Sequence, residues 1–217
     1  AVRCRSCSYS SKKSHAEYCI YLRAAMGLEE EDTYARPSLG YGYGGYGALP
    51  YSHRRSSSLG GGPPRRAEIP ATSLDELFEA YTRVEQIDGY KCEKCGSRLG
   101  CEQSSYIKNK PNILVVYISR QKDTNRYGKI NRVVEFPERF DLSPFVEAEE
   151  RHGNLSYKLY GVVVHKDVNN STFFGHYIAC VKTSSGMWNI MDDASVSRVS
   201  WATVQDQQAD LLFYAAE

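Results

Sequence analysis

The sequence predicts an α+β fold built mainly on an antiparallel β-sheet, and two features carry this prediction. Short runs of β-branched and aromatic residues, separated by turn residues, fill the second half of the chain. One segment has the spacing of an amphipathic helix. With 217 residues, the chain can bury one substantial core, or a core with a small appendage.

The predicted helix lies in "TSLDELFEAYTRVE". Ser73 is placed to cap its first turn, and Glu76, three residues later, completes a capping box. Leucine and aromatic residues recur on one stripe, which is expected to face the core. The stripe consists of Leu74, Leu77, Phe78 and Tyr81. The strands expected after the helix are residues 112–119, 157–165, 176–182, 187–191 and 210–215.

Charge and hydropathy exclude several classes of protein. The chain has 27 basic and 26 acidic residues, and a net charge of +1 is not that of a general nucleic-acid or membrane-surface binder. No run approaches the roughly 20 apolar residues that cross a bilayer, and the start lacks the apolar stretch of a secretory signal. We expect a soluble protein of the cytoplasm or nucleus. Because the chain begins without methionine, we also expect the natural protein to continue upstream.

Residues 27–72 differ in composition from the rest of the chain. They contain "YGYGGYG" and "HRRSSSLGGGPPRR" and have almost no aliphatic periodicity. Such a composition cannot offset the entropy of ordering, so we expect a disordered insertion. Its "RRSS" tract suits a basophilic kinase, and its arginines and tyrosines could touch nucleic acid, but a solvated loop is the favoured interpretation.

Four of the seven cysteines form two Cys-x-x-Cys pairs, Cys4 with Cys7 and Cys92 with Cys95. Two such turns supply the four soft ligands of a structural zinc and resemble the knuckles of a zinc ribbon. The pairs can meet across the insertion because closure entropy grows only logarithmically with loop length. The alternative is that they are ordinary turn cysteines. The remaining cysteines, Cys19, Cys101 and Cys180, are expected to be small buried residues.

His176 and the acidic pair Asp192 and Asp193 lie on two neighbouring predicted strands. A hairpin between these strands would bring the imidazole and a carboxylate within hydrogen-bonding reach. His165 also lies on a predicted strand, but no hairpin places an acid beside it. Candidate catalytic chemistry is therefore assigned to His176.

The register of this hairpin has two possible forms. If residues 185–186 form a two-residue loop, His176 falls opposite Ser195. If residues 184–186 form a three-residue loop, His176 falls opposite Ala194. Either register leaves the imidazole within a residue or two of the acidic pair.

A paired imidazole and carboxylate need a nucleophile or a metal to complete a reaction. No second histidine lies near His176 in the sequence, and no cysteine stands at the start of the predicted helix. Cys180 is four residues along the same strand, roughly 13 Å away at about 3.3 Å per residue. We expect the nucleophile to lie outside this chain.

Seven stretches carry a resemblance to a known family. In order they are "KCEKCG", "PNILVVYISR", "FPERFDLSPF", "YKLYGVVVH", "FGHYIACVK", "WNIMDDASVSRV" and "ADLLFY". In this order and approximate spacing they resemble the ubiquitin-specific proteases, a family of cysteine deubiquitinases. The resemblance covers about residues 1–26 and 73–217.

The resemblance implies a papain-like cysteine protease fold, described as fingers, palm and thumb. Residues 1–26 and 73–110 would form the fingers with their zinc ribbon, and residues 111–217 would form the palm. The family's thumb carries the nucleophilic cysteine in a Gly-Asn-Thr-Cys-type box. That box is absent from this sequence, so the chain resembles a partial catalytic domain.

The resemblance also implies catalytic roles for three residues. His176 matches the general base, which takes the thiol proton and later protonates the leaving amine. Asp192 matches the residue that orients the imidazole. Asp193 matches a second polar position that supports the oxyanion or substitutes for Asp192.

Three further residues are expected to contact the substrate. Gly175 and Tyr177 would line the channel for the Gly-Gly tail of ubiquitin, and Trp188 is grouped with them. The sequence departs from the family in "ISRQ", where "LKRF" is usual, in "VHKD", and in Asp210, where an aromatic residue is common. None of these departures touches the predicted catalytic residues.

The leading hypothesis is that the chain is the C-terminal portion of a deubiquitinase that cleaves after the last glycine of ubiquitin. Its partners would be ubiquitin and ubiquitinated proteins, with a structural zinc as its cofactor. A second hypothesis is a catalytically silent scaffold that binds ubiquitin. A third, a zinc-ribbon module that binds nucleic acid, is disfavoured by the near-neutral charge.

Overall fold

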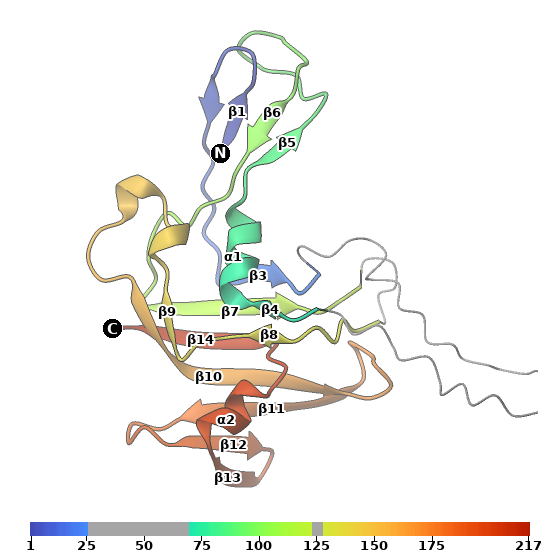
Figure 1. Ribbon diagram of the computed structural model, residues 1–217, viewed down its shortest axis with the longest axis vertical. Helices are drawn as coiled ribbons and strands as arrows, with labels where there is room; N and C mark the ends of the chain where they lie inside the picture. Colours follow the sequence, from blue (N-terminus) through green and yellow to red (C-terminus); the bar gives the residue numbers. More distant parts are fainter. Residues whose placement is uncertain (26–69, 123–127) are drawn as a thin grey trace, which may run out of the picture.

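The computed structural model describes residues 1–25, 70–122 and 128–217, and Figure 1 shows their arrangement. Within these ranges, a sheet of eight strands and a sheet of four strands make up most of the fold. The greater part of the predicted insertion, residues 27–69, lies outside the described residues.

The large sheet runs in the order β13-β12-β11-β10-β14-β7-β3, and β9 pairs with the first part of β10. Its pairings are antiparallel except that between β3 and β7. The strands are β3 (Ile20–Arg23), β7 (Ile113–Ser119), β9 (Arg139–Asp141), β10 (Ser156–Asp167), β11 (Gly175–Lys182), β12 (Trp188–Asp192), β13 (Ser195–Val199) and β14 (Leu211–Ala216). All five predicted strands are confirmed, with ends that differ by about two residues or fewer.

Other parts of the large sheet were not predicted. Strand β3 has only four residues, too few to show a period, and β13 exposes most of its side chains. Helix α2 (Trp201–Gln205) is a single short turn of five residues, which shows no apolar stripe. Among the described residues, no helix is long and apolar enough to cross a bilayer.

The small sheet projects from the large one at the end opposite β13 (Figure 1). Its order is β2-β1-β6-β5, and its strands come from the two segments predicted as fingers. Two elements of those segments, β3 and α1, lie instead with the large sheet, because their apolar side chains are buried in its core. The small-sheet strands are β1 (Val2–Cys4), β2 (Ser10–Ser11), β5 (Glu85–Ile87) and β6 (Cys101–Gln103).

The predicted insertion ends earlier than expected. Thr72 is 5% exposed and pairs with Val134, in a parallel pair formed by β4 (Thr72–Ser73) and β8 (Val134–Glu135). A buried, paired backbone belongs to the folded part of the chain, so the prediction is wrong at this boundary.

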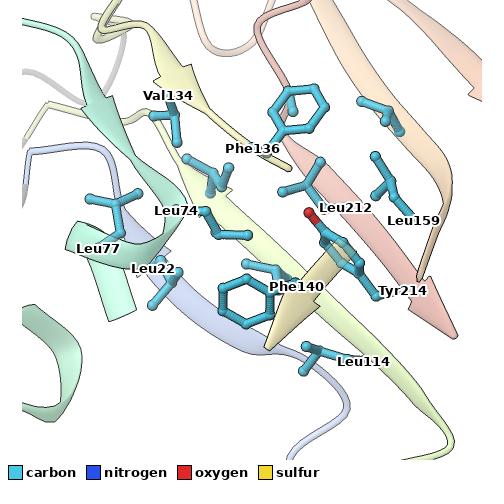
Figure 2. Packing of buried hydrophobic residues seen from close by; sticks show 14 of the residues in the cluster. Leu22, Leu74, Leu77, Leu114, Val134, Phe136, Phe140, Leu159, Leu212 and Tyr214 are labelled. Carbon is cyan, nitrogen blue, oxygen red and sulfur yellow. The ribbon is translucent and has the colours of Figure 1, made fainter. Parts of the chain in front are cut away.

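Helix α1 (Leu74–Thr82) begins with the predicted capping box. The Ser73 hydroxyl accepts a hydrogen bond from the Glu76 backbone N–H at 3.1 Å, and the Glu76 carboxylate accepts one from the Ser73 N–H at 3.2 Å. Figure 2 shows Leu74 and Leu77 turned into the core. They are clustered there with residues of the strands, among them Leu22, Leu114, Phe140 and Tyr214. Two 3₁₀ turns, Ser143–Phe145 and Ala148–Glu150, connect β9 to β10.

The capping box gives a first prediction. Ser73→Ala removes the acceptor for the Glu76 N–H and should lower the free energy of unfolding by about 1 kcal/mol in urea denaturation. Ser197→Ala, at an exposed serine of β13, is the matched control and should change it little. Equal losses for the two variants would contradict a specific capping role.

Candidate active site

The loop between β11 and β12 has three residues, 184–186. The Thr183 N–H donates to the Met187 carbonyl at 2.9 Å, and the Gly186 N–H donates to the Thr183 carbonyl at 2.9 Å. Gly186 has a φ of 84°, the left-handed conformation that completes a three-residue hairpin loop. The loop thus selects one of the two predicted registers.

In this register Ala179 pairs with Met191. Continuing the pairing along β11 places His176 level with Ala194, as the three-residue loop predicts, and not with Ser195. The side chains at every second position share one face of the sheet. His176 and Asp192 therefore lie on the same face of the sheet, and both are exposed there.

His176 and Asp192 form a hydrogen bond of 2.5 Å between Nε2 and Oδ1. Their side chains are 46% and 51% exposed, so the pair is open to an approaching group. An ionised carboxylate can only accept, which assigns the Nε2 proton to the imidazole. In the neutral ring, Nδ1 then has the free lone pair and is the nitrogen that can take a proton.

The same hydrogen bond raises the pKa of His176 above its ordinary value, because the carboxylate favours the charged imidazolium. The negative charges of Asp192 and Asp193 act in the same direction, and partial desolvation opposes them. The His176 imidazole is therefore a stronger base than that of a free histidine.

Asp193 lies in the two-residue turn between β12 and β13, where Asp192 pairs with Ser195. Its φ of 50° is left-handed, a conformation that aspartate tolerates better than most residues. One carboxylate oxygen of each aspartate and a ring nitrogen of His176 lie within 4.8 Å of one another. The position of Asp193 follows from the turn, and its charge adds to that of Asp192.

Gly175 is required by the close approach of β10. A Cβ at this position would lie 2.4 Å from the Lys166 carbonyl oxygen and 2.5 Å from Nε2 of His165. The absence of a side chain at Gly175 therefore makes room for the backbone of β10. The contact of Gly175 with substrate stays a prediction.

Tyr177 lies on the face of β11 opposite to His176, since adjacent residues of a strand point to opposite sides. Its ring is 4.7 Å from that of His165, the residue with which it pairs across β10 and β11. Tyr177 is 61% exposed, and its contact with substrate also stays a prediction.

Trp188 does not lie in an accessible place. It is 4% exposed and stacks on Trp201 of α2, with ring centroids 5.6 Å apart. A side chain covered in this way has no surface to offer a substrate. We therefore place Trp188 in the packing against α2, at the end of β12 away from Asp192, as a correction to its predicted substrate contact.

Two charged residues next to the site were not predicted to act there. Asp210 accepts a hydrogen bond from the His165 N–H at 2.9 Å, and Lys129 donates to the His165 carbonyl at 2.5 Å. Asp210 was noted only as a departure from a family pattern, and Lys129 belongs to no local motif. Both act through contacts between residues distant in the sequence.

The two cysteine pairs meet at the tip of the small sheet. The Sγ atoms of Cys4 and Cys95 are 3.8 Å apart, as are those of Cys7 and Cys92, and all four lie within 4.8 Å. Sulfurs bound tetrahedrally at about 2.3 Å from a zinc would lie about 3.8 Å apart. The cluster could hold such an ion.

The backbone near this cluster favours a thiolate. The N–H groups of Cys7 and Ser6 point at the Cys4 sulfur, with the Ser6 nitrogen 3.3 Å away, and they lower the pKa of Cys4 to about 6. Because metal ligands must be deprotonated, these donors prepare the site for a cation.

The His176–Asp192 pair has no thiol within reach in this structure. All seven cysteines are described, and four are in the cluster. Cys180 is buried further along β11, and Cys101 belongs to the small sheet. Cys19 precedes β3, which lies four strands from β11, or roughly 19 Å at about 4.8 Å per strand.

Residues 2–214 match the family model for ubiquitin carboxyl-terminal hydrolase. This match defines the class of protein, and the papain-like fold, made mostly of β-sheet, agrees with it. The chain belongs to the ubiquitin carboxyl-terminal hydrolase family, and the resemblance to ubiquitin-specific proteases is confirmed.

Individual relatives agree with this assignment. Ubiquitin carboxyl-terminal hydrolase 19 of Arabidopsis thaliana is 38% identical over 148 residues, which are 67% of this chain and 22% of the relative. Ubiquitin carboxyl-terminal hydrolase 42 of Homo sapiens is 33% identical over 147 residues, 66% of this chain and 11% of the relative. The chain thus spans only a small part of the relatives it matches.

Solved structures give the same fold. A SAGA DUB module with Ubp8, bound to ubiquitin aldehyde, has a TM-score of 0.56 and 28% identity over 68% of this chain and 36% of that chain. A second, bound to monoubiquitin, has a TM-score of 0.70 and 23% identity over 100% of this chain and 39% of that chain.

The raised basicity of His176 can be tested directly. Asp192→Asn replaces the carboxylate with a neutral acceptor, so the pKa of His176 should fall toward its ordinary value of about 6.5 in an NMR titration of the ring protons. Asp193→Asn should cause a smaller fall, since Asp193 acts by charge alone. A larger fall with Asp193→Asn would contradict the assignment of Asp192 as the bonded partner.

Proposed function

We propose that this chain is the part of a cysteine-type deubiquitinase that supplies the general base and the zinc-binding fingers. The observation that carries the proposal is the hydrogen bond between His176 and Asp192, which leaves Nδ1 free to accept a proton. Membership of the ubiquitin carboxyl-terminal hydrolase family supports it. The reaction would be hydrolysis of the isopeptide or peptide bond after the C-terminal glycine of ubiquitin.

In the proposed mechanism, Nδ1 of His176 takes the proton of a cysteine thiol that residues outside this chain contribute. The thiolate attacks the carbonyl carbon of the last glycine of ubiquitin, and His176 returns the proton to the leaving amine. Water then hydrolyses the thioester with His176 again acting as base. Asp192 holds the ring in its tautomer and stabilises the imidazolium that forms in each cycle.

Ubiquitin and ubiquitinated proteins are the proposed partners. Two similar solved structures contain monoubiquitin and ubiquitin aldehyde as the molecules bound to those proteins. In the chain described here, Gly175 and Tyr177 flank the base and are the proposed contacts for the tail of ubiquitin. Asp193 is proposed to support Asp192 through its charge.

A structural zinc is the proposed cofactor. Its ligands would be the thiolates of Cys4, Cys7, Cys92 and Cys95, whose spacing is that of a tetrahedral sulfur site. When bound, the ion would tie the turn after β1 to the turn between β5 and β6. This crosslink would hold the tip of the small sheet, which has few buried apolar residues of its own.

The zinc proposal predicts one equivalent of metal for each chain in elemental analysis of the purified protein. Cys92→Ser should lose most of it, because removal of one thiolate leaves an incomplete set of ligands. Cys101→Ser, at a buried cysteine of the same sheet outside the cluster, is the control and should retain it. Less than about half an equivalent in the unsubstituted protein would refute a four-ligand site.

The catalytic proposal predicts that this chain alone releases no reporter from a ubiquitin C-terminal fluorogenic substrate, whereas the complete protein does. In the complete protein, His176→Ala should lower kcat about a thousandfold or more, because base catalysis and thiol activation are lost together. Asp192→Ala should cost less, since Asp193 remains nearby. Activity of this chain alone, or full activity of His176→Ala, would contradict the proposal. A complete protein that binds ubiquitin without turnover would identify a silent scaffold.

A further inference from the structure

Lys129 is buried beside the start of β11, with its side chain 1% exposed. Its Nζ donates to the His165 carbonyl at 2.5 Å and lies 3.3 Å from the Asp167 carboxylate. Burying an ammonium group is costly, and a buried ion pair often adds little stability over an apolar side chain of similar size. Stability alone is therefore a poor explanation for a lysine at this position.

The lysine binds β10 where a neighbouring strand is missing. The pairing of β10 with β14 ends at Val163 and Leu211, yet β10 continues for four more residues. There Asp210 accepts from the His165 N–H at 2.9 Å, and Lys129 donates to the His165 carbonyl. The two side chains thus take the hydrogen bonds that another strand would make, and they keep this end of β10 extended.

The opposite edge of the same segment carries the candidate catalytic strand. Lys166 is the register partner of His176 in the pairing of β10 with β11. The two residues that Lys129 binds, His165 and Asp167, stand on either side of Lys166. Because Lys166 pairs with His176, we expect a shift of this part of β10 to move the backbone of His176 as well.

Lys129 is itself held in place. It belongs to the strap, which we define as residues 128–132. The Ile130 N–H donates to the Arg120 carbonyl at 2.6 Å, and the buried Arg120 guanidinium donates to the carbonyls of Ile130 and Arg132 at 3.3 and 2.6 Å. The ammonium group is therefore presented to β10 by a segment with little freedom to shift.

The strap also forms hydrogen bonds with the loop that leads into β11, residues 168–174. The Lys129 N–H donates to the Asn170 carbonyl at 3.0 Å, and the Asn170 side-chain amide donates to the Lys129 carbonyl at 3.2 Å. The Asn131 side chain bonds to that of Asn170 as well. Asn169 and Asn170 are both left-handed, with φ of 57° and 59°, so the loop has a defined and unusual shape.

We propose that Lys129 is a positioning residue, which fixes the end of β10 so that the imidazole of His176 meets Asp192 in the correct geometry. This proposal rests on the proposed function for its catalytic meaning, but the geometry it describes can be tested independently. Without the ammonium group, the His165 carbonyl and the Asp167 carboxylate lose their shared partner. The end of the β10–β11 pair would then loosen, and the hydrogen bond from Nε2 of His176 would weaken.

The pKa of His176 can distinguish a positioning role of Lys129 from a direct effect of its positive charge. Within the described residues, Asp192 and Asp193 are the charged groups that act on His176 from the β12 side, and Lys166 is its register partner on β10. Removing a nearby positive charge can by itself only raise the pKa of an imidazole. A fall after the loss of Lys129 would require a weaker bond to Asp192.

The experiment is an NMR titration of His176 in this chain with Lys129→Met and, as a matched loss of charge, Lys166→Met. Lys166 donates to the half-buried Gln207 side chain, and within the described residues its ammonium group holds no backbone group. Lys129→Met should lower the pKa of His176 by about half a unit or more, whereas Lys166→Met should leave it unchanged or raise it. A folded Lys129→Met protein whose His176 pKa is unchanged or raised would overturn the proposal.

A second pair of variants decides the question if Lys129→Met fails to fold. Asn170→Gly keeps the left-handed backbone and removes the side-chain bonds to the strap. Asn169→Gly makes the same change at the adjacent left-handed residue, for which the described structure records no side-chain hydrogen bond. The first variant should lower the pKa of His176 more than the second, and equal values would overturn the proposal.

In the complete protein, Lys129→Met should reduce kcat about ten- to hundredfold with little change in KM, since a small misplacement of a catalytic group has that effect. If the complete protein shows no hydrolysis while the titration results hold, the proposed function fails and the positioning role stands. If hydrolysis is present but Lys129→Met changes only KM, the positioning role fails.

Discussion

The register of the β11–β12 hairpin is the constraint on which the candidate active site depends. A slip of one residue between two strands moves a side chain to the other face of the sheet. Only in the observed register do His176 and Asp192 share a face and approach to 2.5 Å. The three-residue loop that ends in left-handed Gly186 enforces that register. A loop more than seven residues from the imidazole thus decides which acid it meets.

The site lies where strands end, and at such places backbone groups lack hydrogen-bond partners from a neighbouring strand. Side chains must replace these partners if the strand is to stay in place. Asp210 and Lys129 do so for His165, and the left-handed turn at Asp193 closes β12 beside the imidazole. These contacts give the buried Lys129 side chain its polar partners. Groups at strand ends are also the ones most open to a substrate.

Local patterns in the sequence predicted those parts of the fold that local interactions determine. The capping box of Ser73 and Glu76 and the paired cysteine turns are set by residues a few positions apart, and the strands follow from runs of β-branched residues. The glycine at position 186 is compatible with the observed three-residue loop, but the sequence alone left two loop lengths possible. Lys129 was missed because its partner is 36 residues away. Trp188 was misplaced because its burial depends on stacking against a short helix that shows no apolar stripe.

The central claim is the register, and interstrand NMR contacts measure it most directly. In an antiparallel pair, opposed residues that do not exchange backbone hydrogen bonds bring their Hα protons closest together. The observed register predicts Hα–Hα cross-peaks between Cys180 and Ile190 and between Lys182 and Trp188. A cross-peak between the Hα protons of Val181 and Ile190 would show the two-residue loop instead and would contradict this account of the site.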